Sequence, residues 1–69
     1  MNPELEILKH FEYDHLPPRL GAVSQMFHET AHIMARNYTG EELKIGLRKL
    51  LEAKDCFVRC EVAKVKAGS

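Results

Sequence analysis

Apolar residues between positions 18 and 37 recur every three or four positions, which is the spacing of one face of an α-helix. This stripe consists of Leu20, Val23, Phe27, Ala31 and Met34, and it continues to Tyr38. A second, narrower stripe on another side of the same helix consists of Ala22, Met26 and Ile33. The helix predicted over 18–37 therefore has two faces to bury.

A second helical pattern runs from residue 41 to about residue 64. Its apolar side consists of Leu43, Leu47, Leu50, Leu51, Phe57, Val58, Val62 and Val65. A neighbouring side is charged and contains Lys44, Arg48, Glu52, Asp55 and Arg59. Thr39, with Glu42 three residues later, has the sequence of a capping box, so Thr39 is the expected N-cap. Asp55 and Arg59 are four positions apart, the spacing of a helical ion pair.

Residues 1–13 form an arm, in which Pro3, Leu5, Ile7, Leu8 and Phe11 predict a short helix that Phe11 pins to the core. Leu16 precedes a proline and is expected to be extended, whereas Pro18 suits the first position of the next helix. Only a few residues separate the two long helices, so they should run antiparallel. The predicted fold is all-α: a single domain over 1–69 in which a short N-terminal helix precedes an αα-hairpin.

A hairpin of two helices and an arm leaves apolar surface uncovered. The second stripe on the helix over 18–37 is the surplus, so we expect the hairpins to assemble into a homo-oligomer and cover one another's faces. A 69-residue chain also has a poor surface-to-volume ratio, which oligomerisation relieves.

The charge balance narrows the possible partners. The chain has ten basic and ten acidic side chains and a formal net charge of zero. Proteins that grip a nucleic-acid backbone carry a basic surplus, so a polymer of DNA or RNA is not the expected partner, whereas a small anion remains open. Without a membrane-length apolar run or a secretory signal, the expected location is the cytoplasm, where Cys56 and Cys60 are reduced thiols at a helix packing surface.

The string His28-Glu29-Thr30-Ala31-His32 has the form HExxH, the zinc-binding signature of helical metalloproteases. A zinc site needs a third ligand, for which Glu52 lies at a suitable distance along the chain, and a hydrolase also needs a substrate cleft. A chain of this length cannot supply both a metal platform and cleft walls. We therefore expect no enzyme activity, no cofactor and no metal site, with His28 and His32 half-exposed at the edge of the apolar stripe; adventitious zinc binding stays open.

Two other features invite a functional explanation. Lys54 falls in the middle of the apolar side of the second helix, where its amine either reaches water along an apolar surface or meets an anion or Glu61 at a subunit boundary. Tyr13 precedes the first long helix, where an exposed aromatic ring is suited to stack on a base and the helix start offers N–H groups to a phosphate.

The segments FEYDHLPPRLGAVSQMFHETAH and GLRKLLEAKDCFVR, within residues 11–59, resemble small phage proteins that share a helical hairpin domain, the anti-CBASS and anti-Thoeris sponges. The resemblance implies a protein without catalysis that forms symmetric oligomers, commonly hexamers. It also implies that the protein acts in the cytoplasm of the bacterial host during phage infection. There it would hold cyclic di- or trinucleotide immune signals without cleaving them, so that the immune effector stays inactive.

The resemblance also implies roles for individual residues. Tyr13 matches the aromatic that stacks on the bases, and His28 falls where the family has a lysine on the phosphate, a departure that makes the cation partial and pH-dependent. Arg48 falls near an arginine of a separate pocket for larger cyclic oligonucleotides. Lys54 and Arg59 join the expected ligand-binding residues because they are cations at or beside the predicted interface. The preferred nucleotide is left open, and so is the alternative of a structural or protein-interaction hairpin with no small ligand.

Overall fold

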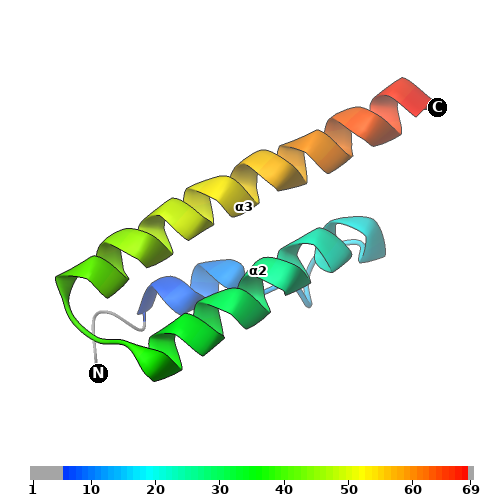
Figure 1. The fold of residues 1–69 in the computed structure, drawn as a ribbon. Helices are drawn as coiled ribbons and strands as arrows, with labels where there is room; N and C mark the ends of the chain where they lie inside the picture. Colours follow the sequence, from blue (N-terminus) through cyan, green and yellow to red (C-terminus); the bar gives the residue numbers. More distant parts are fainter. Residues whose placement is uncertain (1–5, 69) are drawn as a thin grey trace.

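The computed structural model describes residues 6–68, and for residues 65, 67 and 68 it describes the backbone alone. Its elements are a 3₁₀-helix η1 (Ile7–Phe11) and two α-helices, α2 (Pro18–Asn37) and α3 (Glu41–Gly68). Figure 1 shows α2 and α3 running antiparallel, with η1 beside α2. The predicted all-helical hairpin is confirmed. Pro3 and Leu5 of the predicted arm helix lie outside the described residues, and so does the side chain of Val65, which was predicted on the apolar side of α3.

The two prolines set the start of α2. Pro17 is extended, with φ −55° and ψ 151°, and Pro18 occupies the first turn, where a missing N–H costs no hydrogen bond. The Gly21 N–H then donates to the Pro17 carbonyl at 2.8 Å. At the other end Tyr38 turns extended while its N–H still donates to the Met34 carbonyl at 3.0 Å, which closes the last helical turn.

The residue that caps the start of α3 differs from the capping-box prediction. The helix begins at Glu41, and the Lys44 N–H donates to the Gly40 carbonyl at 3.2 Å. Gly40 therefore takes the N-cap position that the sequence pattern gave to Thr39. Gly40 has φ 97°, a left-handed conformation that glycine adopts without steric cost, and the short turn needs it to reverse the chain. The far end of α3 extends to Gly68, four residues beyond the expected limit at Lys64.

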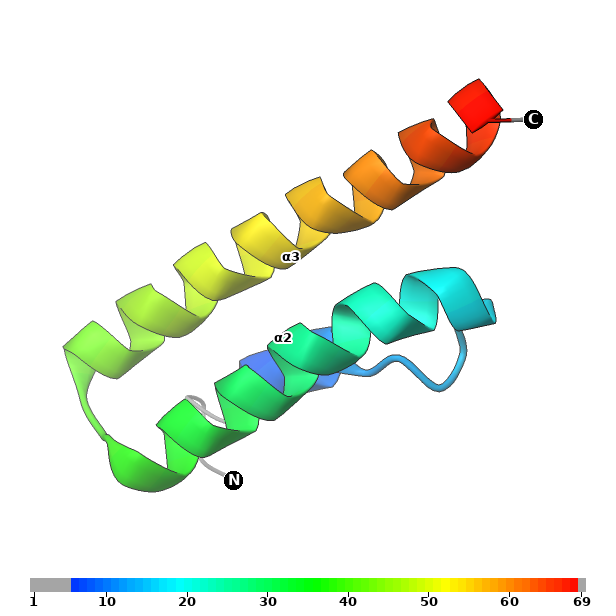
Figure 2. The ribbon, with the colours of Figure 1, turned by 45° about the vertical axis from the view of Figure 1, so that its right-hand side comes forward.

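The arm forms a third layer on one side of the hairpin. It is a 3₁₀-helix, so the short helix predicted in the arm is confirmed, and it packs against both α2 and α3. Figure 2 shows η1 alongside the middle of α2. Phe11 has no exposed surface and lies in the core with Ala31, Leu43 and Leu47. The expectation that Phe11 pins the arm to the hairpin is therefore confirmed.

The core is small, and several large apolar side chains stay exposed. They are Met26, Ile33, Met34, Tyr38, Ile45 and Phe57, which are between 39% and 61% exposed. The predicted surplus stripe accounts for Met26 and Ile33, but Met34, Tyr38 and Phe57 belong to the stripes that were expected to close the hairpin. No helix among residues 6–68 is long and apolar enough to cross a membrane.

Candidate ligand site at Tyr13 and His28

The segment between η1 and α2 places Tyr13 beside α2. The Leu16 N–H donates to the Tyr13 carbonyl at 3.1 Å, which closes a turn. The same carbonyl lies close to Gly21, where an added Cβ would be only 3.4 Å from it. A small residue at position 21 therefore lets the segment lie against α2. Tyr13 is partly buried, rather than exposed as the sequence suggested.

Tyr13 and His28 come from separate segments and are in contact. Their ring centroids are 5.2 Å apart with an interplanar angle of 75°, an edge-to-face arrangement. His32 follows one turn later on α2, with its ring centroid 4.3 Å from that of His28. A hollow of about 370 Å³ lies along this part of α2, lined by His28, Glu29, His32, Ile33 and Arg36. We call it the histidine hollow.

The hydrogen bonding of His28 is incomplete. Its Nδ1 is buried and has no hydrogen-bond partner among the described residues. In the neutral ring, the tautomer with its hydrogen on Nε2 avoids burying an unpaired N–H. Nε2 is then the nitrogen of His28 that can donate to a ligand.

The positive charge of the histidine hollow comes chiefly from Arg36. The pKa of His32 is lowered from its usual value of 6.5 by burial, and further by the nearby His28 and Arg36. His32 is therefore less often cationic than an ordinary histidine, whereas an arginine keeps its charge at any physiological pH. Sequence reasoning missed Arg36, although its position one turn after His32 was a usable signal.

The other three predicted ligand residues do not join Tyr13 and His28. The Lys54 amine lies 2.9 Å from the Asp55 carboxylate, and its side chain is only 14% exposed. The suggested partner Glu61 instead lies 3.7 Å from the Arg19 guanidinium. The Asp55 carboxylate therefore pairs with Lys54 and not with Arg59, the partner that the sequence spacing predicted.

Arg59 and Arg48 lie elsewhere on α3. The Arg59 guanidinium donates to the Cys56 sulfur at 3.3 Å, and the exposed Cys56 and Cys60 are free thiols rather than packed ones. Arg48 is exposed on the side of α3 that faces η1, where it lines a hollow with Lys9 and His10. The chain thus separates a Tyr13–His28 site from a second cationic region around Arg48.

The HExxH string does not assemble into a larger ligand cluster. His28 and His32 are both partly buried at the edge of the core, as expected, and the Glu29 carboxylate accepts from the Gln25 amide at 3.2 Å. Glu52 lines a different hollow, between α3 and Ile7. Within residues 6–68 no group of three or more His, Cys, Asp or Glu side chains is placed to hold a metal ion.

Comparison with known proteins assigns no family: no family model, curated protein or solved structure matches this chain. The function must therefore be argued from the geometry of the chain itself.

Proposed function

We propose that this protein binds and sequesters cyclic oligonucleotide second messengers of bacterial anti-phage immunity, without cleaving them. The observation that carries the proposal is the contact between Tyr13 and His28, because His28 also lines the hollow that contains Arg36. Binding the base and the phosphate of one nucleotide requires an aromatic ring and a cationic side chain close together.

The chemistry of the hollow fits such a ligand. Stacking of a base on an aromatic side chain contributes about 1–3 kcal/mol. The Arg36 guanidinium is suited to a bidentate, charge-assisted contact with phosphate oxygens, and the His28 Nε2–H is a second donor in the same hollow. Residues on a helix and a turn tied to it lose little conformational entropy on binding.

The size of the histidine hollow suggests how much of the ligand one copy holds. At about 370 Å³ it lies at the small end of ligand pockets. A cyclic dinucleotide carries two bases and two phosphates, so one copy would hold half of it and a second copy the other half. Self-assembly, with the hexamer that the resemblance implies, therefore belongs to this proposal.

Arg48 is assigned to a second site for larger cyclic oligonucleotides. It shares a hollow with Lys9 and His10, and this group of basic side chains is separate from the histidine hollow. Lys54 and Arg59, also predicted to bind the ligand, line neither of these hollows, and the structure pairs them with Asp55 and Cys56.

The test is isothermal titration calorimetry with a panel of cyclic di- and trinucleotides and cyclic ADP-ribose isomers. Tyr13→Ala should weaken dinucleotide binding about 5- to 150-fold, the equivalent of one lost stacking contact, whereas Tyr13→Phe should bind nearly as the parent does. Chromatography of the ligand recovered from the complex should return it unchanged. A folded protein that binds no member of the panel at micromolar concentrations would end the proposal.

The alternative is a hairpin that docks on another protein through its exposed apolar residues and has no small ligand. The exposed Met34, Tyr38 and Phe57 are the observation in its favour. Binding to a host protein that survives replacement of both Tyr13 and His28 would support this alternative.

A further inference from the structure

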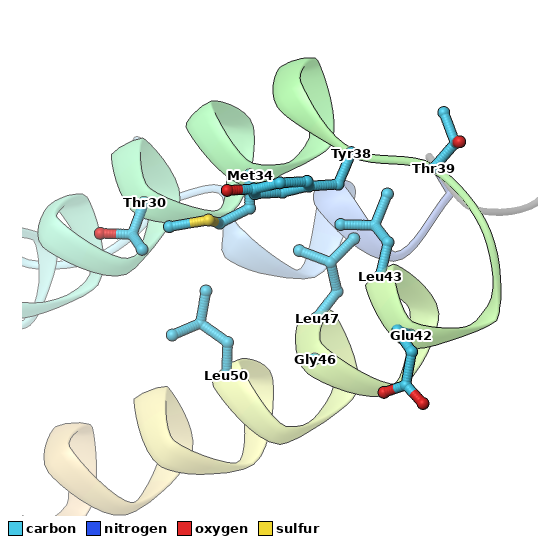
Figure 3. Close-up of a pocket in the computed structure, with 9 residues that line it drawn as sticks. All are labelled: Thr30, Met34, Tyr38, Thr39, Glu42, Leu43, Gly46, Leu47 and Leu50. Carbon is cyan, nitrogen blue, oxygen red and sulfur yellow. The ribbon is translucent and has the colours of Figure 1, made fainter.

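Two hollows follow one another along the groove between α2 and α3. The first, near the turn, has a volume of about 410 Å³ and is shown in Figure 3, where Met34 and Tyr38 reach toward the leucines of α3. The second, near the open end of the hairpin and also about 410 Å³, includes Phe27 and Phe57, whose rings stack with centroids 5.9 Å apart. No residue of η1 lines either hollow, so this face of the hairpin is uncovered.

The positions of α3 that line the two hollows are symmetric about a midpoint between Ala53 and Lys54: positions 43, 46, 47 and 50 on one side match positions 64, 61, 60 and 57 on the other. If a second copy lies antiparallel across that midpoint, Leu50 of one copy faces Phe57 of the other. Leu47 then faces Cys60, and Gly46 faces Glu61. In each pair, one residue lines the hollow near the turn and the other lines the hollow near the open end. The turn-side hollow of each copy therefore lies against the open-end hollow of the other.

The residues of α2 are consistent with the same antiparallel arrangement. Phe27 is level with Phe57 in the hairpin, because their rings stack. The same two-fold rotation therefore places Phe27 of one copy against Met34 of the other, and Val23 against Tyr38. All four residues line the two hollows. The stacked Phe27–Phe57 pair at one end of the groove thus meets the apolar hollow at the other end.

The charges at the two ends of the groove are complementary. Glu42 borders the turn-side hollow and Lys64 borders the open-end hollow. In the antiparallel arrangement Lys64 faces Leu43 of the second copy and so lies beside its Glu42, and two-fold symmetry makes this contact twice. Lys54, close to the midpoint, lines neither hollow, and its amine already has Asp55 as a partner. The chain's net charge of zero adds no overall repulsion between the copies.

From these observations we infer that the groove between α2 and α3 is the interface of an antiparallel, two-fold symmetric dimer of this chain. In it, Phe27 and Phe57 of each copy pack against Met34 and Leu50 of the other. The chain measures 44 × 19 × 16 Å, so its broad face is of the same order as the ~800 Å² that each partner buries in a stable dimer. Met26 is the one residue of the outer stripe assigned to assembly by the sequence pattern that also borders this surface, and pairing through it does not require a bound nucleotide.

A disulfide crosslink tests the register. Gly46→Cys is combined with Cys56→Ser, leaving Cys60 as the only native thiol. An added Cβ at Gly46 meets nothing within 4 Å, so the substitution is accommodated. Within one chain, positions 46 and 60 of α3 are about 21 Å apart, too far for a disulfide, which needs Cα atoms within about 7 Å. Mild oxidation should therefore produce a covalent dimer, in which the introduced thiol at position 46 of one copy is joined to Cys60 of the other.

Two control variants test whether the copies pair antiparallel and which side of α3 forms the interface. Ile45→Cys in the same background moves the thiol to the outer side of α3 and should give little crosslinking. Adding Cys60→Ser to the Gly46→Cys protein should abolish the dimer, whereas a parallel pairing would still join the two introduced thiols at position 46. Crosslinking that is equal for positions 45 and 46, or that persists without Cys60, would overturn the register.

The mass of the protein in solution tests the surface itself. Native mass spectrometry and light scattering should show a dimer or a multiple of it at about 10 µM, and Phe57→Glu should raise the dimer dissociation constant at least about 100-fold. Ile45→Glu, which changes an apolar side chain of similar exposure outside the groove, should leave the mass unchanged. A parent protein that is monomeric at about 100 µM would refute the dimer, as would a folded Phe57→Glu protein that associates like the parent.

Discussion

Removing the Phe11 side chain should release the arm from the hairpin. Phe11 has no exposed surface and is the one residue of η1 that is fully buried in the core. Truncating a buried phenylalanine to alanine costs about 3–5 kcal/mol through lost burial and the cavity left behind. A domain of this size has a total unfolding free energy of roughly 3–10 kcal/mol at 0.05–0.15 kcal/mol per residue. Phe11→Ala should therefore remove a large part of the stability of the chain.

Urea denaturation followed by far-ultraviolet circular dichroism measures this loss. With a slope of about 1 kcal/mol per molar urea, the midpoint should fall by about 3–5 M. All titrations use one protein concentration, because self-association makes the apparent stability concentration-dependent. The control is Ile45→Ala, whose side chain is 45% exposed and should change the unfolding free energy by no more than about 0.5 kcal/mol. A loss below about 1 kcal/mol for Phe11→Ala would refute the docking of the arm and, with it, the placement of Tyr13.

Three further predictions concern single positions. Gly46→Ala should stabilise the hairpin by about 0.5–1 kcal/mol, because alanine favours the helix, whereas Gly40→Ala should destabilise it by about 1 kcal/mol because φ is 97° there; both are read from urea midpoints. Ser24→Ala should be neutral or stabilising by about 1 kcal/mol, since the buried Ser24 hydroxyl has no hydrogen-bond partner among the described residues; thermal unfolding measures it. The lowered pKa of His32 means that the fold prefers its neutral ring, so stability should decrease as the pH falls below 6.5, the ordinary value that it regains on unfolding. His32→Gln should flatten this decrease in urea titrations between about pH 7.5 and about pH 5.5, and the exposed His10→Gln should not.

The fold followed from the sequence wherever a periodic pattern or a proline determined it. The stripe over 18–37 and the proline pair at its start define α2, because helical spacing and a missing N–H each allow few alternatives. The start of α3 at Glu41 was predicted correctly, but its N-cap was placed one residue too early. Thr39 with Glu42 satisfies a local pattern, whereas the tight turn requires a positive φ, which Gly40 adopts without steric cost. The arm became a 3₁₀-helix because a short segment lacks the length to propagate an α-helix and follows its packing partners.

The candidate site was less predictable, because side-chain contacts depend on rotamers and on tertiary placement. Tyr13 was named from its position before α2 and His28 through a family resemblance, but their contact depends on tertiary structure: the turn at Leu16 and the small Gly21 let the segment lie against α2. Arg36 lay on the same helical side as His28 but was overlooked, because a surface arginine near a helix end is common. Lys54 was expected at a boundary, and its partner turned out to be the adjacent Asp55, a contact that helical spacing alone does not suggest.

The two proposals place different demands on assembly. His28, His32 and Arg36 lie on another side of α2 from Phe27 and Met34, so pairing through the groove leaves the two histidine hollows facing away from each other. A cyclic dinucleotide shared by two copies would therefore join neighbouring dimers. Ile33, from the outer stripe predicted for assembly, lines the histidine hollow and would lie at that second contact. One two-fold interface in the groove and one contact between dimers are sufficient to close three dimers into a hexamer, the number that the family resemblance implies.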